Sequence, residues 1–320
     1  MTPIIRCAAV TFAVLSLPHA TAALAQSYPA RPIRIIVGPG PDILSRVLGQ
    51  KFTDAWGQQT VIDQRPGAGG TISADMVAKA TPDGYTLLMA TSAYTINAVL
   101  QPGAFDLVKD FAAIAFCATS PYILVANLSV PAHSAQELIA LAKSRPGQIN
   151  FASSGNGTGN HLAGERLKSM VGINMVHVPY KGAAPAMVAV IAGEVQVSLQ
   201  IPPATLGAIQ GGKVRALAVT SLQRSRLVPD LPTLAESGVA GFEAIAWNGL
   251  LAPARTPRAI VAKINGEVMR ELKQPAVLQR FNDVGWEPAS ENSPEWFADY
   301  IKRDIVKWTK VVKDTGAKVD

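Results

Sequence analysis

Short apolar runs alternate with longer amphipathic segments from residue 33 onward. Residues 33–37 are mostly apolar and β-branched, as in a buried strand, and residues 43–52 then repeat apolar positions at helical spacing. The same alternation predicts further strands at 60–63, 85–90, 149–152, 175–178, 195–199 and 214–219, and helices at 71–80, 160–171, 183–192 and 204–210. The pattern therefore indicates an α/β protein with mostly parallel sheets flanked by helices.

Helix-start signals support several of these elements. Ser134 and Glu137 form an S-x-x-E capping box, which predicts a helix that closes near residue 146. After residues 247–252 the alternation stops, and helices are predicted at 257–272 and 294–314. An apolar stripe marks the second of these, and we expect it to pack on a core: Phe297, Ile301, Ile305, Trp308 and Val312.

The chain length favours more than one compact unit. It has 320 residues, of which 48 % are apolar and 16 % charged, so disorder is excluded for the bulk of the chain. This length suits one large domain or two of ordinary size. Two sheets fit the run of predicted strands better than one.

The first 25 residues read as a secretory signal peptide. Arg6 precedes an apolar run at 7–17, and small residues at 23–25 suit a cleavage site. The run is shorter than the ~20 residues that a membrane-spanning helix needs. We therefore expect export to the periplasm. Loss of the leader would remove Cys7 and leave Cys117 as a single thiol without a disulfide partner.

The net charge of +6 is spread along the chain rather than gathered. No Lys/Arg run of the kind that follows a phosphate backbone occurs, so nucleic acid is not an expected partner. A diffuse positive charge instead raises the local concentration of small anions without selecting one.

Three Gly-rich turns each lie between a predicted strand and a predicted helix: residues 38–41, 66–70 and 153–159. Such turns can present backbone N–H groups to an anion at the start of a helix. For the second turn we favour a purely conformational need for glycine. The third turn adds the hydroxyl groups of Ser153, Ser154 and Thr158, which makes it a candidate anion site.

Motifs for other chemistry are incomplete. The glycines of the third turn do not complete G-x-G-x-x-G, because Asn160 stands at the last position. The sequence has no G-x-S-x-G elbow and no H-E-x-x-H pair, so hydrolase and metal-site readings lack support. His161 is either a ligand contact or a structural group, and Trp247 either lines a cleft or packs in the core.

The residues that carry a family resemblance run through most of the chain. They form motifs at 28–34, 65–70, 82–88, 151–158, 161–165, 177–182, 215–221, 229–233 and 249–253. In these segments the chain resembles the Bug-type solute receptors of tripartite tricarboxylate transporters. The resemblance implies a two-lobed periplasmic binding protein of type II-like architecture, which closes on a small carboxylate.

The same resemblance implies domain bounds and site residues. We expect residues 26–124 and 245–320 to form the first lobe and residues 125–244 the second. The expected ligand contacts are Gly38, Gly40, Thr91, Ser92 and Tyr94 in the first lobe, and Ser153, Ser154, Gly157, Thr158, His161 and Gln200 in the second. No catalytic residue, metal or cofactor is expected.

Two departures from the family pattern sharpen these expectations. The segment 37–42 is several residues shorter than its usual counterpart. Either Gly38 and Gly40 supply the backbone donors in a tighter turn, or this half of the expected grip is altered or weakened. Gln200-Ile201 replaces a common Asp-Asn pair, and a neutral amide cannot pair with an ammonium group. We therefore predict a ligand without an amine, such as a plain di- or tricarboxylate or an aromatic acid.

The resemblance thus implies a receptor that hands an organic carboxylate to the membrane permease subunits of a tripartite transporter, and we expect it to be a monomer. An alternative is a receptor that presents its ligand to a membrane sensor kinase. An enzyme on a similar α/β scaffold is a third possibility, although no nucleophile–base pair supports it.

Overall fold

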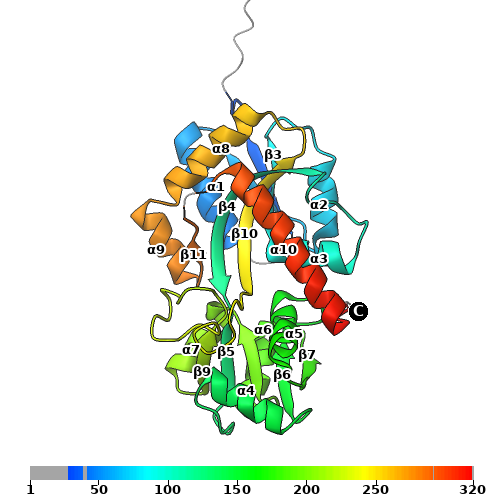
Figure 1. Cartoon of the computed structure of the whole chain (residues 1–320). Helices are drawn as coiled ribbons and strands as arrows, with labels where there is room; N and C mark the ends of the chain where they lie inside the picture. Colours follow the sequence, from blue (N-terminus) through cyan, green and yellow to red (C-terminus); the bar gives the residue numbers. More distant parts are fainter. Residues whose placement is uncertain (1–27, 39–41, 291, 319–320) are drawn as a thin grey trace, which may run out of the picture.

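The computed structural model describes residues 28–38, 42–290 and 292–318. These form two lobes, each built on one β-sheet with helices against it (Figure 1). The expected leader at residues 1–25 lies outside the described residues.

The sheet of the first lobe has the strand order β11-β4-β10-β3-β1-β2. Its strands come from both ends of the chain: β1 (Ile33–Val37), β2 (Thr60–Gln64), β3 (Thr86–Thr91), β4 (Phe111–Pro121), β10 (Ile245–Pro253) and β11 (Glu287–Pro288). Its helices are α1 (Ile43–Trp56), α2 (Thr71–Ala78), α3 (Ser92–Leu100), α8 (Arg258–Glu271), α9 (Pro275–Asp283) and α10 (Pro294–Thr315), with a 3-10 turn, η1, at Ala68–Gly70.

The sheet of the second lobe has the order β7-β6-β8-β5-β9. Its strands are β5 (Ile123–Asn127), β6 (Ile149–Ser153), β7 (Met175–Pro179), β8 (Val197–Gln200) and β9 (Val214–Val219). Four helices accompany them: α4 (Ala135–Ser144), α5 (Gly159–Val171), α6 (Ala183–Ala192) and α7 (Pro202–Gln210).

Both sheets are mixed, which differs from the mostly parallel sheets that the alternation predicts. In the first lobe β1 pairs in parallel with β2 and β3, as expected, but β10 is antiparallel to β3 and β4. In the second lobe β6 is parallel to β7 and β8, whereas β5 is antiparallel to β8 and β9. The antiparallel pairs involve β4, β5 and β10, the strands next to the crossings between lobes, where no βαβ connection sets the direction.

Two crossing segments join the lobes, and Thr220 ties them together. The first passes from β4 through Tyr122 into β5, and the second enters β10 through Ala244. The Tyr122 N–H donates to Thr220 Oγ1 at 2.8 Å, and this hydroxyl lies 2.6 Å from the Ala244 carbonyl oxygen. Because Thr220 is fully buried, these bonds fix the spacing of the two segments at the pivot between lobes.

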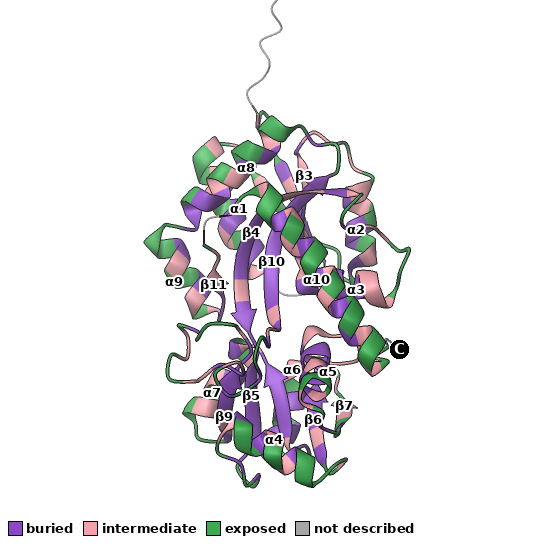
Figure 2. Ribbon diagram, viewed as in Figure 1, coloured by how far each residue is buried: buried purple, intermediate pink, exposed green. Residues whose placement is uncertain are grey.

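The helix α10 also contacts both lobes. It runs from the first lobe down to α5 of the second (Figure 1). Phe297, Ile301 and Trp308 are buried, which confirms the predicted packing of its apolar stripe, and the outer faces of the helices are exposed (Figure 2). Asp304 on the buried face accepts from Thr95 Oγ1 at 2.6 Å and from Trp247 Nε1 at 3.0 Å.

Buried side chains settle two expectations from the sequence. Trp247 is fully buried, so it packs in the core rather than lining a cleft. Cys117, on β4, is a free and fully buried thiol, and burial raises its pKa to about 12.

Candidate functional site

The N-termini of α3 and α5 face each other where the lobes meet, and Tyr122 lies between them. Ser92, the first residue of α3, lies close enough to the Tyr122 hydroxyl to offset part of the rise in its pKa that burial causes. The hydroxyl also lies so close to Gly159, the first residue of α5, that a Cβ atom there would be 2.1 Å away. The Tyr122 side chain therefore lies beside the first residue of each helix.

This junction is electrostatically suited to an anion. Neither α3 nor α5 has an acidic residue in its first turn, and no side chain caps α5. The first N–H groups of a helix lack intrahelical acceptors, and the helix dipole adds positive potential there. Burial, with the negative charge of Asp304 nearby, raises the pKa of Tyr122, which keeps its hydroxyl protonated.

In the first lobe, Gly38 lies directly against a buried pair of hydroxyl groups. A Cβ atom at this position would be 2.0 Å from the Tyr94 hydroxyl oxygen and 2.5 Å from Ser73 Oγ. Ser73 donates to the Gly70 carbonyl at 2.8 Å, so Tyr94 donates to Ser73 at 2.7 Å. The turn after β1 can approach this closely only because residue 38 has no side chain.

The remaining first-lobe candidates sit at the end of β3 and the start of α3. Thr91 is the N-cap of α3, and its Oγ1 accepts from the Ala93 N–H at 3.3 Å. Ser92 follows it and is buried. Gly40, also predicted as a contact, lies outside the described residues.

The loop between β6 and α5 is held by hydrogen bonds to Asn160. Its Nδ2 donates to Ser154 Oγ at 2.9 Å, and its Oδ1 lies 2.6 Å from Thr158 Oγ1. Ser154 Oγ in turn donates to Gln200 Oε1 at 3.3 Å. Gln200 is almost fully buried at the end of β8, where its Nε2 donates to Ser198 Oγ at 3.2 Å. The structure therefore brings Ser154, Thr158 and Gln200 into one network.

Two histidines, His161 and His177, also hold the loop between β6 and α5. The Gly157 N–H donates to His161 Nδ1 at 3.0 Å. Ser153 Oγ lies 2.6 Å from His177 Nε2, and the two imidazole rings stack with centroids 3.9 Å apart. Ser153, Gly157 and His161 thus bond within the loop, and Ser153 is fully buried.

Four residues of this site were missed from the sequence: Tyr122, Ser73, Asn160 and His177. Asn160 carried a usable signal, since a polar side chain one residue into a helix can bond back to its own turn. His177 lies in one of the family motifs. Tyr122 and Ser73 gave no local signal, because their partners are distant in sequence.

The second Gly-rich turn has the structural role that we favoured. Gly67, Gly69 and Gly70 all have positive φ, which disfavours other residues there. Asn97 Nδ2 donates to the Gly69 carbonyl at 3.1 Å and secures this turn to α3.

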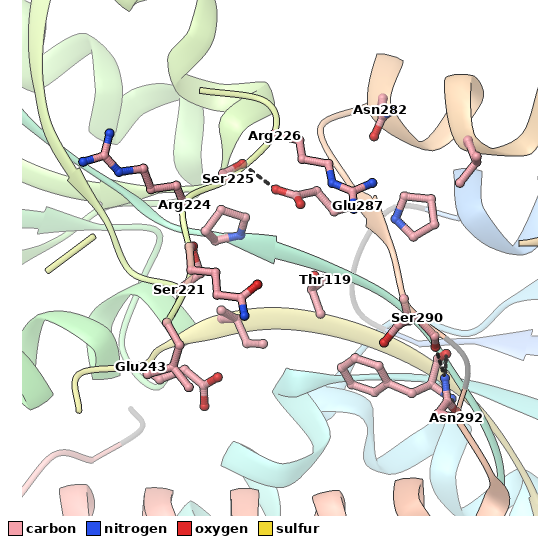
Figure 3. A pocket seen from close by; sticks show the side chains of 18 of the residues that line it. Thr119, Ser221, Arg224, Ser225, Arg226, Glu243, Asn282, Glu287, Ser290 and Asn292 are labelled. Atoms are coloured by element: carbon pink, nitrogen blue, oxygen red, sulfur yellow. Dashed lines mark hydrogen bonds between the residues drawn. The ribbon is translucent and has the colours of Figure 1, made fainter. Parts of the chain in front are cut away.

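A separate cleft of about 620 Å³ lies near β4, α9, β11 and the loop 221–226 (Figure 3). It contains none of the predicted contacts. Ser225 of the second lobe donates to Glu287 of the first across it at 2.5 Å. A second contact of the lobes lies nearby, where a Cβ atom on Gly285 would be 2.5 Å from Pro203.

Two features are absent from the described part of the chain. None of its helices combines the length and apolar character needed to cross a bilayer. No group of three or more His, Cys, Asp or Glu side chains is placed there to hold a metal ion.

Two lobes, two crossing segments and helix N-termini that meet between the lobes define a periplasmic binding protein. Solved structures of this class share the architecture along most of the chain. R. palustris Rpa4515 with adipate is 32 % identical with a TM-score of 0.78, covering 92 % of this chain and 100 % of that one. MatC from Rhodopseudomonas palustris with bound malate is 31 % identical with a TM-score of 0.74, covering 89 % and 100 %.

The family model of the tripartite tricarboxylate transporter family receptor, TctC, matches residues 44–317. Protein BugT of Bordetella pertussis is 35 % identical over 319 residues, which cover 96 % of this chain and 98 % of BugT. The chain belongs to this receptor family, and the resemblance to Bug-type receptors is confirmed. It is therefore a periplasmic solute-binding protein from a family of receptors rather than enzymes.

Proposed function

We propose that this receptor captures a small organic carboxylate between its lobes and delivers it to the membrane permease subunits of a tripartite transporter. The observation that carries the proposal is the meeting of the α3 and α5 N-termini at Tyr122. The adipate and malate named with two solved relatives support the same ligand class.

The α5 N-terminus is the main proposed carboxylate contact. Most of the second-lobe hydroxyl groups already bond within the loop, so we assign direct contact chiefly to the backbone N–H groups of the first turn of α5. Charge-assisted hydrogen bonds of this kind are strong when closure excludes water. Gly38, Thr91 and Ser92 would supply the first-lobe side of the grip.

The second-lobe site favours a ligand without an ammonium group. Gln200 is neutral, and its amide is already oriented by Ser154 and Ser198. Glu165, the acidic residue of α5, is paired with Lys168 at 2.8 Å. An ammonium group would lose its water without gaining a carboxylate partner, which costs binding free energy.

Titration calorimetry with matched acids tests both parts of the proposal. Succinate and aspartate differ by one ammonium group, as do adipate and 2-aminoadipate. We expect the plain acid of each pair to bind at least about tenfold more tightly, equivalent to about 1.4 kcal/mol. Tighter binding of the amino acids would contradict the ligand class, and binding of no acid would contradict carboxylate capture.

Delivery to a permease needs a separate measurement. Uptake of the labelled acid by cells is expected only when this chain and the permease genes are present together. Uptake that is unchanged after deletion of this chain would contradict the transport role.

A further inference from the structure

His177 has no role in the function proposed so far, yet it contacts the loop at two points. It lies on β7, beside Ser153 of β6. Its Nε2 is 2.6 Å from Ser153 Oγ, and this hydroxyl also accepts the Gly155 N–H at 3.1 Å. His177 therefore reaches the backbone of the loop through Ser153.

The second contact runs through His161. The rings of His161 and His177 stack at 3.9 Å with an interplanar angle of 11°, and Phe151 packs against both, with centroids 4.8 Å from His177 and 6.5 Å from His161. Phe151 is fully buried, and Gly164 leaves room for it, because a Cβ atom there would be 2.4 Å from the Phe151 ring. The three rings form a platform under the loop 153–158.

The hydrogen bond at His161 defines its protonation state. Nδ1 accepts the Gly157 N–H at 3.0 Å, which requires an unprotonated Nδ1. In the neutral ring the proton is then on Nε2, which lies 4.0 Å from Glu165 Oε1. A proton added at Nδ1 would face the Gly157 N–H, and two donors cannot bond to each other.

Glu165 is the carboxylate that faces the ring pair: its Oε1 lies 4.0 Å from His161 Nε2, and Lys168 shares its charge. On α5, Glu165 is already bound by Lys168, whose Nζ lies 5.5 Å from the Phe151 ring centroid. On β6 the neighbours are Phe151 and Ser153, which are uncharged. Two imidazolium rings stacked at this spacing would repel each other.

We propose that His177 is a positioning residue of the ligand loop, which holds Ser153 directly and Gly157 through His161, and that the loop keeps its binding geometry only while His161 is neutral. This inference rests on the proposed function, since the loop leads into the α5 N-terminus assigned to the carboxylate. Acidification is then expected to weaken binding, because protonation removes the acceptor of the Gly157 N–H.

Two substitutions separate the contacts of His177. His177→Phe keeps a ring for stacking and loses the Ser153 bond, whereas His177→Gln keeps a hydrogen-bonding group and loses the stack. In the ligand-free protein, amide hydrogen exchange at Gly155 is expected to rise about fivefold to tenfold in His177→Phe, the effect of one lost hydrogen bond. Exchange at Gly157 is expected to rise in His177→Gln. His133→Gln, at an exposed histidine before α4, is the matched control and should change neither amide.

Acid affinity across about pH 5 to 8, where histidines titrate, tests the role of His161. We expect the wild-type affinity for adipate or malate to fall about tenfold toward the acid end. His161→Asn, whose Oδ1 can replace Nδ1 as an acceptor without titrating, should remove this dependence. Circular dichroism would verify that each variant is folded.

The outcomes distinguish this inference from the proposed function. Unchanged exchange at both glycines in the His177 variants would overturn the positioning role, whatever the ligand. A pH dependence that persists in His161→Asn would overturn the requirement for a neutral His161. If no acid binds, carboxylate capture fails, and the exchange measurements still decide the role of His177.

Discussion

The two lobes prepare their sides of the proposed site in different ways. In the first lobe the turn after β1 is fixed by close packing, because Gly38 rests on the buried hydroxyl groups of Tyr94 and Ser73. In the second lobe the loop before α5 is fixed by side-chain hydrogen bonds from Asn160, His161 and His177. A larger side chain should therefore disrupt the packed turn of the first lobe, and removal of polar groups should disrupt the hydrogen-bonded loop of the second.

Gly38→Ala tests the packed side and should have the largest effect. The new Cβ atom would collide with the fully buried Tyr94, and overpacking of this kind costs about 3 kcal/mol of unfolding free energy. Urea unfolding measures the loss, and Tyr94→Phe in the same chain should restore part of it. Gly207→Ala is the control, since the space around Gly207 is open. Wild-type stability in Gly38→Ala would show that the contact is not tight.

Gly159→Ala tests the contact between the N-terminus of α5 and Tyr122. A Cβ atom there would be 2.1 Å from the Tyr122 hydroxyl, and we expect the collision to be relieved when the lobes move apart. We expect ligand affinity to fall about a hundredfold, or about 2.7 kcal/mol, with little change in the melting temperature of the ligand-free chain. Tyr122→Phe should recover part of the affinity, and X-ray scattering should show a more open molecule. An equal loss of ligand-free stability would argue against an effect on closure.

Asn160→Ala tests the hydrogen-bonded side. It removes the bonds to Ser154 and Thr158 and leaves their polar groups without these partners, while the helix gains a residue of high propensity. Calorimetry should show about a tenfold loss of affinity, equivalent to about 1.4 kcal/mol. The overall stability should change less than in Gly38→Ala. The reverse ranking would contradict the contrast between the lobes.

Glu287→Gln tests whether the separate cleft takes part in closure, and its effect should be the smallest. The amide keeps the shape of the side chain but weakens the charge-assisted bond from Ser225. We expect about a twofold to fivefold loss of ligand affinity, the effect of a fraction of one hydrogen bond. Glu194→Gln, at an exposed position, is the matched control. If Glu287→Gln binds the ligand as tightly as Glu194→Gln, the cleft near β11 takes no part in closure.

Regular elements were largely predictable because their apolar periods are local. The predicted strand 33–37 and helix 183–192 coincide with β1 and α6. The sequence pattern predicts no strand over residues 111–127. Thr119-Ser120-Pro121 interrupts the apolar run where β4 ends, but no local signal shows that β5, from Ile123, joins another sheet. The directions of β5 and β10 depend on how the chain crosses between lobes, which no local pattern records.

The residues of the candidate site were likewise predictable only where their signal is local. Glycines and hydroxyl residues marked both turns, because their backbone and side-chain chemistry is unusual in short segments. Tyr122 reads as one more aromatic residue in an apolar run, and its importance comes only from Ser92 and Gly159, which reach it through the fold. Ser73 is similar, since only the folded chain brings it, on α2, within hydrogen-bond distance of Tyr94 on α3.

The burial of Cys117 makes selective labelling of this receptor practical. A thiol with its pKa raised to about 12 is not a thiolate at neutral pH and does not compete for maleimide dyes. A cysteine introduced at Leu222, which is 55 % exposed beside the cleft near β11, can then carry a single fluorophore in the leaderless chain. Such a conjugate would turn the relative movement of the lobes into an optical signal for its acid.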